Sequence, residues 1–303
     1  MLRYDLVDVF TDRPFAGNQL AVVHDAAHLS VAQLHAIASE FNLSETTFPT
    51  PRGAGEYDVR IFTPAGEIPF AGHPTLGTAW VLRSAGALGP DGAVQHCGAG
   101  QIKVRFDGDR VELSATPRDL SAPVSDEIVE EVLGDLGLSA DDHDGAAYVA
   151  GAGLNFLHLP VRADAIGRAE PARRPVSRFT EAVGPLQDPF DGINLFSVSG
   201  TAPELTVRSR VFVPELSVPE DPATGSAAAG LGMALVAAGL LPDGGRYEIT
   251  QGVELGRPSR LSGRVDAVAG RATECHVAGG VHHVGRGEIA VPPDMSGSGG
   301  HVA

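Results

Sequence analysis

Cysteine and positive charge are both scarce in this chain of 303 residues. Its two cysteines, Cys97 and Cys275, are too few for a disulfide framework, so we expect a protein of a reducing compartment, the cytoplasm. Lysine and arginine number 22 against 38 aspartates and glutamates, which gives a formal net charge of −16 and a pI near 5.0. Nucleic acids and anionic membranes attract positive surfaces, and we expect neither as a partner.

Long apolar segments and leader-like sequences are also missing. The apolar run over residues 226–242 is shorter than the ~20 residues that cross a bilayer, and we interpret it as a buried helix. The first 15 residues alternate polar and apolar side chains and lack the basic start and apolar block of a signal peptide. We therefore expect no membrane association.

The sequence contains neither a dinucleotide-binding motif nor a zinc motif. The glycines near Gly151 lack the GxGxxG spacing and a following helix, so no nicotinamide or flavin is expected. Histidine and cysteine neighbours do occur, but without the spacing of zinc ligands, and adjacent residues of a strand point to opposite faces. We expect no metal and no cofactor at these pairs, which are His96 with Cys97, Cys275 with His276, and His282 with His283.

What the sequence does contain is a pair of similar helix starts. In the first, Gly72 and His73 precede Pro74 and an almost uncharged stretch over residues 75–85. Proline is favoured at the first helical position, where its missing N–H would be unpaired anyway. The pattern predicts a helix that begins at Pro74, and because the stretch is apolar nearly all round, the helix should be enclosed on every side.

The second start lies about half a chain further on. Gly225 and Ser226 precede an apolar run to residue 241, and Asp221 lies just before them. The spacing from Gly72 is 225 − 72 = 153 positions, which predicts two similar lobes that face one cleft. Helix starts carry free N–H groups and partial positive charge, and therefore bind carboxylates. One such segment is ordinary helix capping, but two of them favour an anion site.

Most of the remaining chain reads as short strands of alternating polar and apolar residues. An amphipathic helix should begin at Ser30, and prolines 49 and 51 should close a strand over residues 44–48. Residues 162–192 are rich in proline, alanine and charge, and we interpret them as surface helix and loop. Residues 273–291 should form three separate strands. The expected fold class is α+β: two lobes, each a mostly antiparallel sheet wrapped around one apolar helix.

Three titratable residues are candidates for acid/base chemistry. Glu45 lies in an expected strand. It is either an ordinary solvated glutamate or a cleft residue whose pKa burial raises from about 4.3 towards the working pH. His73 either shuttles a proton or donates a hydrogen bond. Asp221 either complements the helix dipole or orients His73 or a substrate amine across the cleft.

Five segments, in order along the chain, resemble the PhzF-like family, the phenazine-biosynthesis isomerases and their relatives. They are TDRPFAGNQLAVV (11–23), NLSETTF (42–48), EIPFAGHPTLGTAWVL (67–82), EDPATGSAAAGL (220–231) and QGVELGRPSRL (251–261). The resemblance continues to about residue 291. One departure is Gln19, where the family usually has proline, and this affects a turn.

The resemblance implies the diaminopimelate epimerase fold, with two pseudo-symmetric barrel-like lobes and the site between them. We expect an N-terminal lobe over 1–118, joined by a C-terminal strand near 285–292, a second lobe over 119–284 and a disordered tail over 293–303. The resemblance also implies a homodimer. The cysteine pair of epimerase relatives is not at the helix starts here, so two-thiol racemisation is not expected.

By position, Glu45 matches the family's acid/base glutamate, and His73 and Asp221 match its catalytic cleft residues. Gly72, Gly225 and Ser226 match the positions that bind the substrate carboxylate. The implied activity is a cofactor-free proton shift, an isomerisation of a small carboxylate-bearing metabolite. Two alternatives stay open: a racemase or epimerase that uses Glu45 and a second acid, and a non-catalytic binder of small acids.

Overall fold

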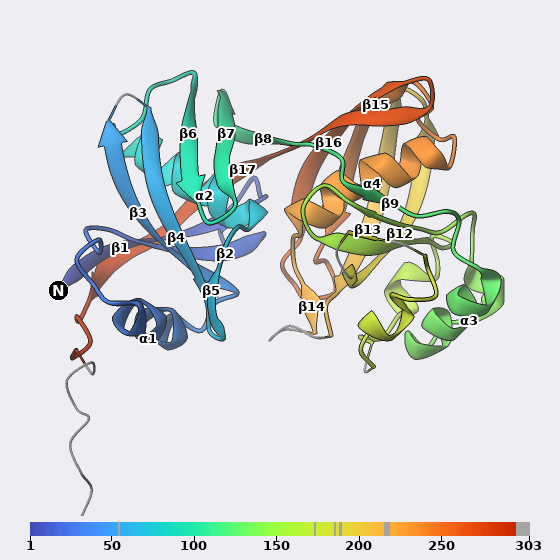
Figure 1. Ribbon diagram of the computed structural model, residues 1–303, viewed down its shortest axis with the longest axis horizontal. Coiled ribbons are helices and arrows are strands. Elements are labelled where there is room, and N and C mark those ends of the chain that lie inside the picture. Colours follow the sequence, from blue (N-terminus) through green and yellow to red (C-terminus); the bar gives the residue numbers. More distant parts are fainter. Residues whose placement is uncertain (54, 173, 185, 188–189, 215–218, 295–303) are drawn as a thin grey trace, which may run out of the picture.

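Two lobes lie side by side in the protein (Figure 1), as the 153-residue spacing predicts. The structure, a computed structural model, describes residues 1–53, 55–172, 174–184, 186–187, 190–214 and 219–294. A long strand, β17 (Arg271–Ile289), runs from one lobe into the other, red in Figure 1. The fold is α+β, and each lobe is a mostly antiparallel sheet around one apolar helix.

The N-terminal lobe is a closed barrel around helix α2 (Gly72–Ser84). Its eight strands pair in the cyclic order β1-β2-β3-β4-β6-β7-β8-β17 and back to β1. A short strand β5 pairs with β4, and helix α1 covers the outside. The bounds are β1 Leu2–Val9, β2 Asn18–Val23, α1 Val31–Phe41, β3 Glu45–Gly53, β4 Glu56–Thr63, β5 Gly66–Ile68, β6 Gly92–Cys97, β7 Gly100–Asp107 and β8 Arg110–Ala115.

The C-terminal lobe repeats this plan around helix α4 (Gly225–Ala237). Its strands follow one another in the order β17-β16-β15-β13-β12-β11-β10-β9, and β14 pairs with β13 as β5 pairs with β4. The bounds are β9 Asp119–Leu120, α3 Asp126–Asp135, β10 Tyr148–Gly151, β11 Asn155–Pro160, β12 Phe190–Thr201, β13 Glu204–Phe212, β14 Glu220–Asp221, β15 Gly244–Gln251 and β16 Ser259–Val268. Three short 3₁₀ turns lie at Ala140–Asp142, Ile166–Arg168 and Ser177–Phe179.

The two lobes correspond down to individual side chains. Arg60 on β4 and Arg210 on β13 each form two hydrogen bonds with a glutamate on the next short strand, Glu67 and Glu220 respectively. Each guanidinium also stacks on the phenylalanine two positions later in its strand, with its carbon 5.2 Å from the ring centre in the first lobe and 4.9 Å in the second. The glutamates are 153 positions apart, as are the helix starts that follow them.

The central helices are buried because they carry almost no charge. In α4, every residue except Ser226 and the last, Ala237, is buried, and α2 has one basic residue, Arg83, in its last turn. Close packing depends on small residues, since a Cβ at Gly77 would lie 2.6 Å from Leu20 Cδ2. The apolar cluster around both helices is continuous from lobe to lobe, so the two halves share one core.

Several predicted boundaries are wrong. Helix α2 begins at Gly72, so Pro74 occupies its third position, still in the first turn where no N–H is needed. Strand β3 continues through Pro49 and Pro51 to Gly53. There β3 pairs with β4, whereas its pairing with β2 ends at Thr47. The prolines therefore lie on an edge, where a missing N–H costs little.

The three strands predicted over residues 273–291 are one strand, β17. Its glycines looked like turns, but they make room for neighbouring residues. A Cβ at Gly279 would lie 2.3 Å from Phe10 Cδ1, and one at Gly280 would lie 2.5 Å from Thr11 O. These glycines let β17 pass between the lobes without a break.

The prediction for residues 162–192 is also wrong. The described part of this segment forms 3₁₀ turns and the start of β12, with no α-helix. Ile166, Val176 and Phe179 are buried and pack in a second apolar cluster with α3. The apolar positions are too widely spaced for a helical pattern, yet they fill this core.

Of the predicted tail, residues 295–303 lie outside the described part of the chain, and the boundary at residues 118 and 119 stays a prediction. No helix in the described ranges is long and apolar enough to cross a membrane.

The repeated arginine–glutamate pair gives a stability test with an internal control. Arg210 and Glu220 have side chains 5% and 3% exposed, and Arg210 also donates to the carbonyls of Ile166 and Ala169. Arg60 and Glu67 are each 38% exposed. We expect Arg210→Met to lower the free energy of unfolding by about 3–5 kcal/mol because it leaves Glu220 charged and buried. Arg60→Met should cost about 1 kcal/mol or less.

Urea denaturation of both variants measures this difference. The double variant Arg210→Met, Glu220→Leu should recover much of the loss, since no buried charge is then left alone. Equal losses in the two single variants would contradict the assignment of Arg210 as a buried structural cation.

Candidate active site

The starts of α2 and α4 meet at two glycines. A Cβ at Gly72 would lie 3.6 Å from Gly225 Cα, and one at Gly225 would lie 3.7 Å from Gly72 Cα. The N-cap residues, Ala71 and Thr224, do not cap their helices with side-chain hydrogen bonds. Two helix starts, with their N–H groups and positive partial charge, therefore lie next to each other between the lobes.

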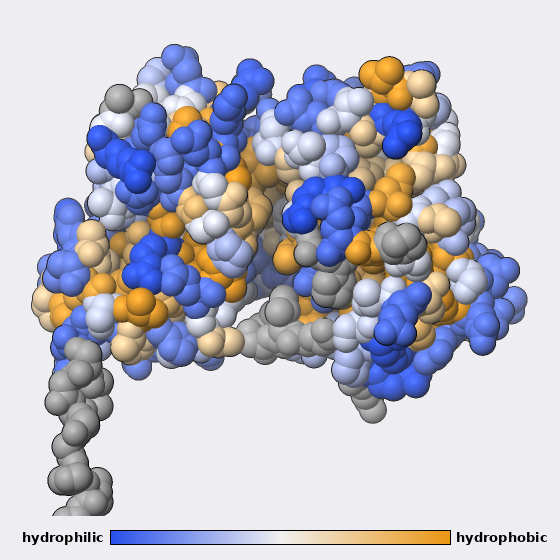
Figure 2. All heavy atoms as spheres, viewed as in Figure 1, coloured by the Kyte–Doolittle hydropathy of each residue, from blue (hydrophilic) through white to orange (hydrophobic). Residues whose placement is uncertain are grey.

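A cavity of about 560 Å³ opens at this contact, in the hollow between the lobes (Figure 2). Apolar side chains from both lobes line it, among them Phe70, Leu154, Phe156 and Val213. All six residues that the sequence singles out also line it: Glu45, His73, Asp221, Gly72, Gly225 and Ser226. The structure thus brings the candidate residues together, and their individual roles stay predictions.

Glu45 is the first residue of β3 and its carboxyl group is almost without polar contacts. Its side chain is 16% exposed, and Oε2 is buried without a hydrogen-bond partner. His73 Nε2 lies 3.4 Å from that oxygen. Burial raises the pKa of Glu45 to about 8, and the nearby charge of Asp221 raises it further in the same direction. A carboxyl group with such a pKa can both release and accept a proton near neutral pH.

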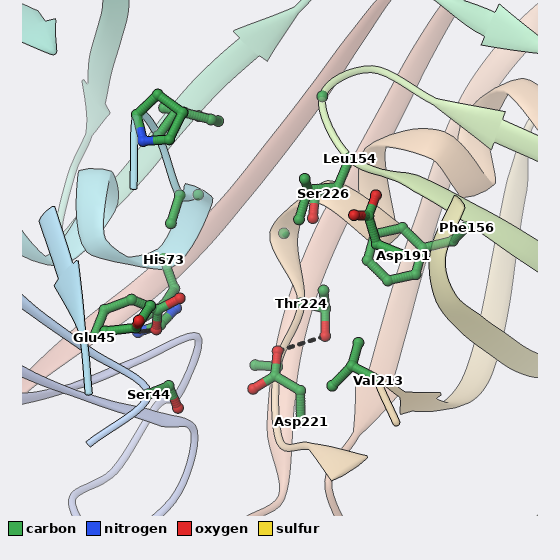
Figure 3. A pocket seen from close by; sticks show the side chains of 18 of the residues that line it. Ser44, Glu45, His73, Leu154, Phe156, Asp191, Val213, Asp221, Thr224 and Ser226 are labelled. Carbon is green, nitrogen blue, oxygen red and sulfur yellow. Dashed lines mark hydrogen bonds and ion pairs between the residues drawn. The ribbon is translucent and has the colours of Figure 1, made fainter. Parts of the chain in front are cut away.

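His73, at the second position of α2, is buried and uncharged. Burial lowers its pKa to about 3, and the main-chain carbonyl of Gln19, 3.3 Å from Nε2, opposes this only partly. Nδ1 lies 3.4 Å from the side-chain amide nitrogen of Asn18. Figure 3 shows His73 and Glu45 together on one wall of the cavity.

Asp221 projects from the C-terminal lobe on the other side. Its carboxylate accepts hydrogen bonds from Thr224 Oγ1 at 2.6 Å (Figure 3) and from Asn18 Nδ2 at 2.9 Å. Its carbonyl oxygen accepts one from Gln251 Nε2 at 2.8 Å. Burial raises the pKa of Asp221 to about 6, although the bonds from Thr224 and Asn18 act in the opposite direction.

Other polar cavity residues were not singled out by the sequence. Arg118, just before β9, supplies the one arginine or lysine among the described lining residues. Asp191 is the second residue of strand β12, much as Glu45 begins β3, and it accepts a hydrogen bond from the backbone N–H of Asn155 at 3.0 Å. The 153-residue repeat does not indicate Asp191, which lies 191 − 45 = 146 positions after Glu45, and Arg118 lies in a segment that reads only as a crossing between lobes.

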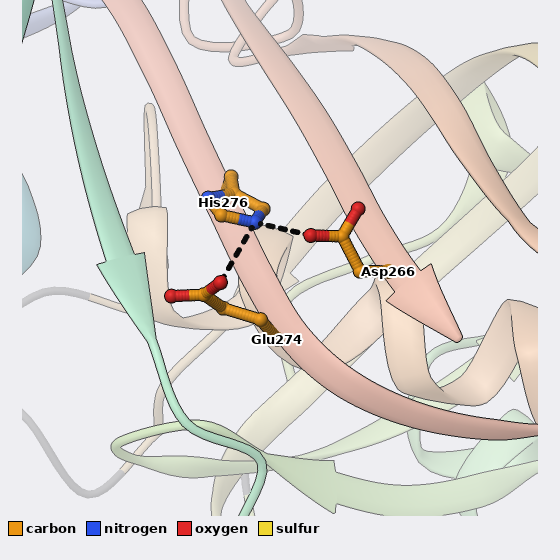
Figure 4. Close-up of side chains that lie close together, drawn as sticks. All are labelled: Asp266, Glu274 and His276. Carbon is orange, nitrogen blue, oxygen red and sulfur yellow. Dashed lines mark hydrogen bonds and ion pairs between the residues drawn. The ribbon is translucent and has the colours of Figure 1, made fainter. Parts of the chain in front are cut away.

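A group of metal-type side chains lies elsewhere, on β16 and β17. His276 Nε2 is 3.0 Å from Asp266 and 3.6 Å from Glu274 (Figure 4). Arg264 also pairs with Asp266 at 2.5 Å, and Ser114 contacts the other ring nitrogen of His276 at 2.8 Å. The three residues do not line the cavity, and their mutual contacts are those of an ion-pair cluster.

The sequence profile of a family described as "Phenazine biosynthesis-like protein" matches residues 7–285. The chain belongs to this family. It is 36% identical over 296 residues to a trans-2,3-dihydro-3-hydroxyanthranilate isomerase of Pseudomonas chlororaphis, an alignment that covers 96% of this chain and all of the relative. Relatives at this level over nearly full length are named isomerases, and the protein is a PhzF-like isomerase.

Solved structures agree with the family and the fold. A predicted epimerase from Pseudomonas aeruginosa is 30% identical and superposes with a TM-score of 0.78 over 95% of this chain and 99% of that one. A PhzF-family protein of Bacillus anthracis has a TM-score of 0.80 over 96% of this chain and 99% of its own. Its identity is 22%, so this second likeness concerns the fold.

The raised pKa of Glu45 predicts a pH-dependent stability difference. Between its ordinary value of 4.5 and about 8, the folded protein keeps a proton that the unfolded chain has released. The free energy of unfolding therefore falls as pH rises through this window, by at most about 1.4 kcal/mol per pH unit. The amide in Glu45→Gln does not titrate, so its free energy of unfolding escapes this loss. Relative to the wild type, the variant should therefore become progressively more stable from pH 5 to pH 8.

Urea denaturation at pH 5, 6, 7 and 8 measures the difference. Glu40→Gln, at an exposed position on α1, is the matched control and should differ from the wild type by a nearly constant amount. A stability difference for Glu45→Gln that does not change with pH would show that this carboxyl group titrates normally.

Proposed function

We propose that the protein isomerises a small unsaturated carboxylate by a cofactor-independent proton shift, with Glu45 as the acid and base. The observation that supports this most is the buried carboxyl group of Glu45, which faces the cavity with an oxygen that lacks a hydrogen-bond partner. Burying such a group without a hydrogen-bond partner costs stability, and perturbed carboxyl groups are typical of active sites.

The substrate carboxylate binds at the paired helix starts in this proposal. The N–H groups near Gly72, Gly225 and Ser226 are the donors, and the Ser226 side chain lines the same cavity. In a protein of net charge −16, these helix starts supply a local positive potential for an anion. They also stabilise negative charge that spreads onto the carboxylate during the reaction.

The proton shift itself balances without a redox partner. The Glu45 carboxylate takes a proton from carbon, and the electron pair of that C–H bond moves into the adjacent conjugated system. The protonated Glu45 then returns its proton to a second carbon, and the double bond ends one position away. The neutral ring of His73 on one side of the cavity and the carboxyl group of Asp221 on the other stabilise the charges that develop during the shift. General acid/base catalysis contributes about 10²–10⁴-fold, so exclusion of water by lobe closure supplies further acceleration.

Epimerisation is the second candidate, favoured by the position of Asp191. Its carboxyl group lies on the wall opposite Glu45 and His73 (Figure 3), where a second acid would be needed to deliver a proton to the other face of a carbon.

The related isomerases are named for trans-2,3-dihydro-3-hydroxyanthranilate, and we propose it as the first substrate to test. A homodimer in the cytoplasm is our proposal for the setting.

Incubation with this compound and with a panel of small unsaturated acids in D₂O tests the function. Deuterium at a shifted carbon identifies isomerisation, whereas deuterium at an inverted centre identifies epimerisation. We expect Glu45→Gln to lower kcat by about 10²-fold or more, because an amide cannot accept the proton. Glu40→Gln should keep the wild-type rate.

Two results would contradict the proposal. Turnover by Glu45→Gln at the wild-type rate would remove Glu45 from the reaction. A carboxylate that raises Tm but is neither converted nor exchanged would instead indicate a binding protein. A ligand at about 100 times its Kd adds about 2.7 kcal/mol to the free energy of unfolding, enough to detect in the same panel.

A further inference from the structure

Asn18, the first residue of β2, connects the catalytic groups of both lobes. Its side chain is buried, 2% exposed. The amide nitrogen donates to Asp221 Oδ1 at 2.9 Å and to Ala223 O at 3.0 Å, both in the C-terminal lobe. The same nitrogen lies 3.4 Å from Nδ1 of His73 in the N-terminal lobe. Asn18 therefore touches both partners of Glu45 without lining the cavity itself.

These contacts determine which ring nitrogen of His73 carries the proton. A carboxylate and a carbonyl oxygen can only accept, so the atom that faces them is the NH₂ group of Asn18. The two hydrogens of this group go to Asp221 and Ala223, and a hydrogen on His73 Nδ1, 3.4 Å away, would point at a donor, so Nδ1 is the ring nitrogen without a hydrogen. The neutral ring then carries its hydrogen on Nε2, which lies 3.3 Å from Gln19 O and 3.4 Å from Glu45 Oε2.

The loop before Asn18 is held in place by the C-terminal lobe. Arg257 donates to Gly17 O at 2.8 Å and to Ala16 O at 3.0 Å, and it pairs with buried Asp8 at 2.5 Å. Gly17 has φ 70°, and a Cβ there would lie 2.2 Å from Val9 O, so only glycine fits. The position of Asn18 is thus fixed from both lobes.

We propose that Asn18 is a positioning residue that holds His73 as the neutral Nε2–H tautomer and thereby aims a hydrogen-bond donor at Glu45. This rests on the proposed function, in which Glu45 alternates between carboxylate and acid. The Nε2–H group bonds to Gln19 O and lies 3.4 Å from Glu45 Oε2, which has no hydrogen-bond partner, so it presents a donor to the carboxylate form and leaves Glu45 free to exchange its proton with the substrate. His73 is then a fixed donor, and it does not relay the proton.

The substitution Asn18→Asp tests this with almost no change of shape. An aspartate at this position has one hydrogen to donate at most, and the Asp221 carboxylate takes it. His73 Nδ1 then faces an acceptor, and we expect it to be protonated at pH 7. Asn42→Asp is the matched control, since Asn42 is an exposed residue at the end of α1 with φ 51°, a conformation that aspartate also adopts.

Long-range ¹H–¹⁵N spectra of ¹⁵N-histidine-labelled protein report the tautomer directly, with the His73 signals assigned by their loss in His73→Gln. The wild type and Asn42→Asp should show Nδ1 without a proton and Nε2 with one. Asn18→Asp should show Nδ1 protonated. A protonated Nδ1 in the wild type, or an unprotonated Nδ1 in Asn18→Asp, would overturn the proposal. If Asn18→Asp fails to fold by circular dichroism, Asn18→Ser replaces it, because its hydroxyl group also has a single hydrogen, and the same two outcomes decide.

Turnover of the substrate found in D₂O provides the second readout. We expect Asn18→Asp to lower kcat by about 10²-fold or more, as expected for a wrongly protonated catalytic histidine, with a much smaller change in KM. A changed spectrum with wild-type kcat would overturn the positioning role. Absence of turnover by the wild type would instead contradict the proposed function, and the spectra would still decide which tautomer Asn18 sets.

Discussion

The approach of two glycine backbones, at Gly72 and Gly225, is the constraint on which the arrangement of the site depends. A Cβ at either position would be in van der Waals contact with the Cα of the opposite glycine, at 3.6 and 3.7 Å, so the two backbones are separated by little more than the width of a methyl group. The strands around each central helix have the same pairing order in both lobes, and β17 belongs to both. The two sheets therefore hold the helix starts at one point, where each adds positive potential to the other.

The positive potential at the two helix starts is opposed by carboxyl groups that lie close together in the same cavity. Glu45 and Asp221 are buried close enough that the charge of Asp221 raises the pKa of Glu45. Part of this cost is avoided because Glu45 holds its proton near neutral pH and His73 stays neutral. The cavity then has room for the charge of an anionic substrate at the helix starts. Once deprotonated beside that anion, Glu45 is a stronger base than a solvated glutamate.

The sequence predicts the features that are local or repeated. Ser30 caps α1, where the sequence predicts a helix to begin, and two similar helix starts 153 residues apart predict the two lobes. It could not predict features that depend on distant contacts. The glycines of β17 look like turns until Phe10 is packed against them. Asn18 meets Asp221 across 203 positions of the chain, and nothing in its neighbourhood indicates that partner. The six candidate site residues were found because most of them belong to the repeat.

The proposed function depends on positions at which the two lobes carry different residues. The two helix starts present the same backbone but different second residues, His73 in one lobe and Ser226 in the other. The arginine–glutamate pair that precedes each start is exposed in the first lobe and buried in the second. A symmetric site would offer the same group to both faces of a substrate. Here Glu45 and the Nε2 side of His73 lie on one wall and Asp191 lies on the other, so the two walls carry different groups. In the proposed allylic shift, one carboxyl group removes and returns the proton on one face, whereas inversion at a carbon would need Asp191 to act from the opposite face.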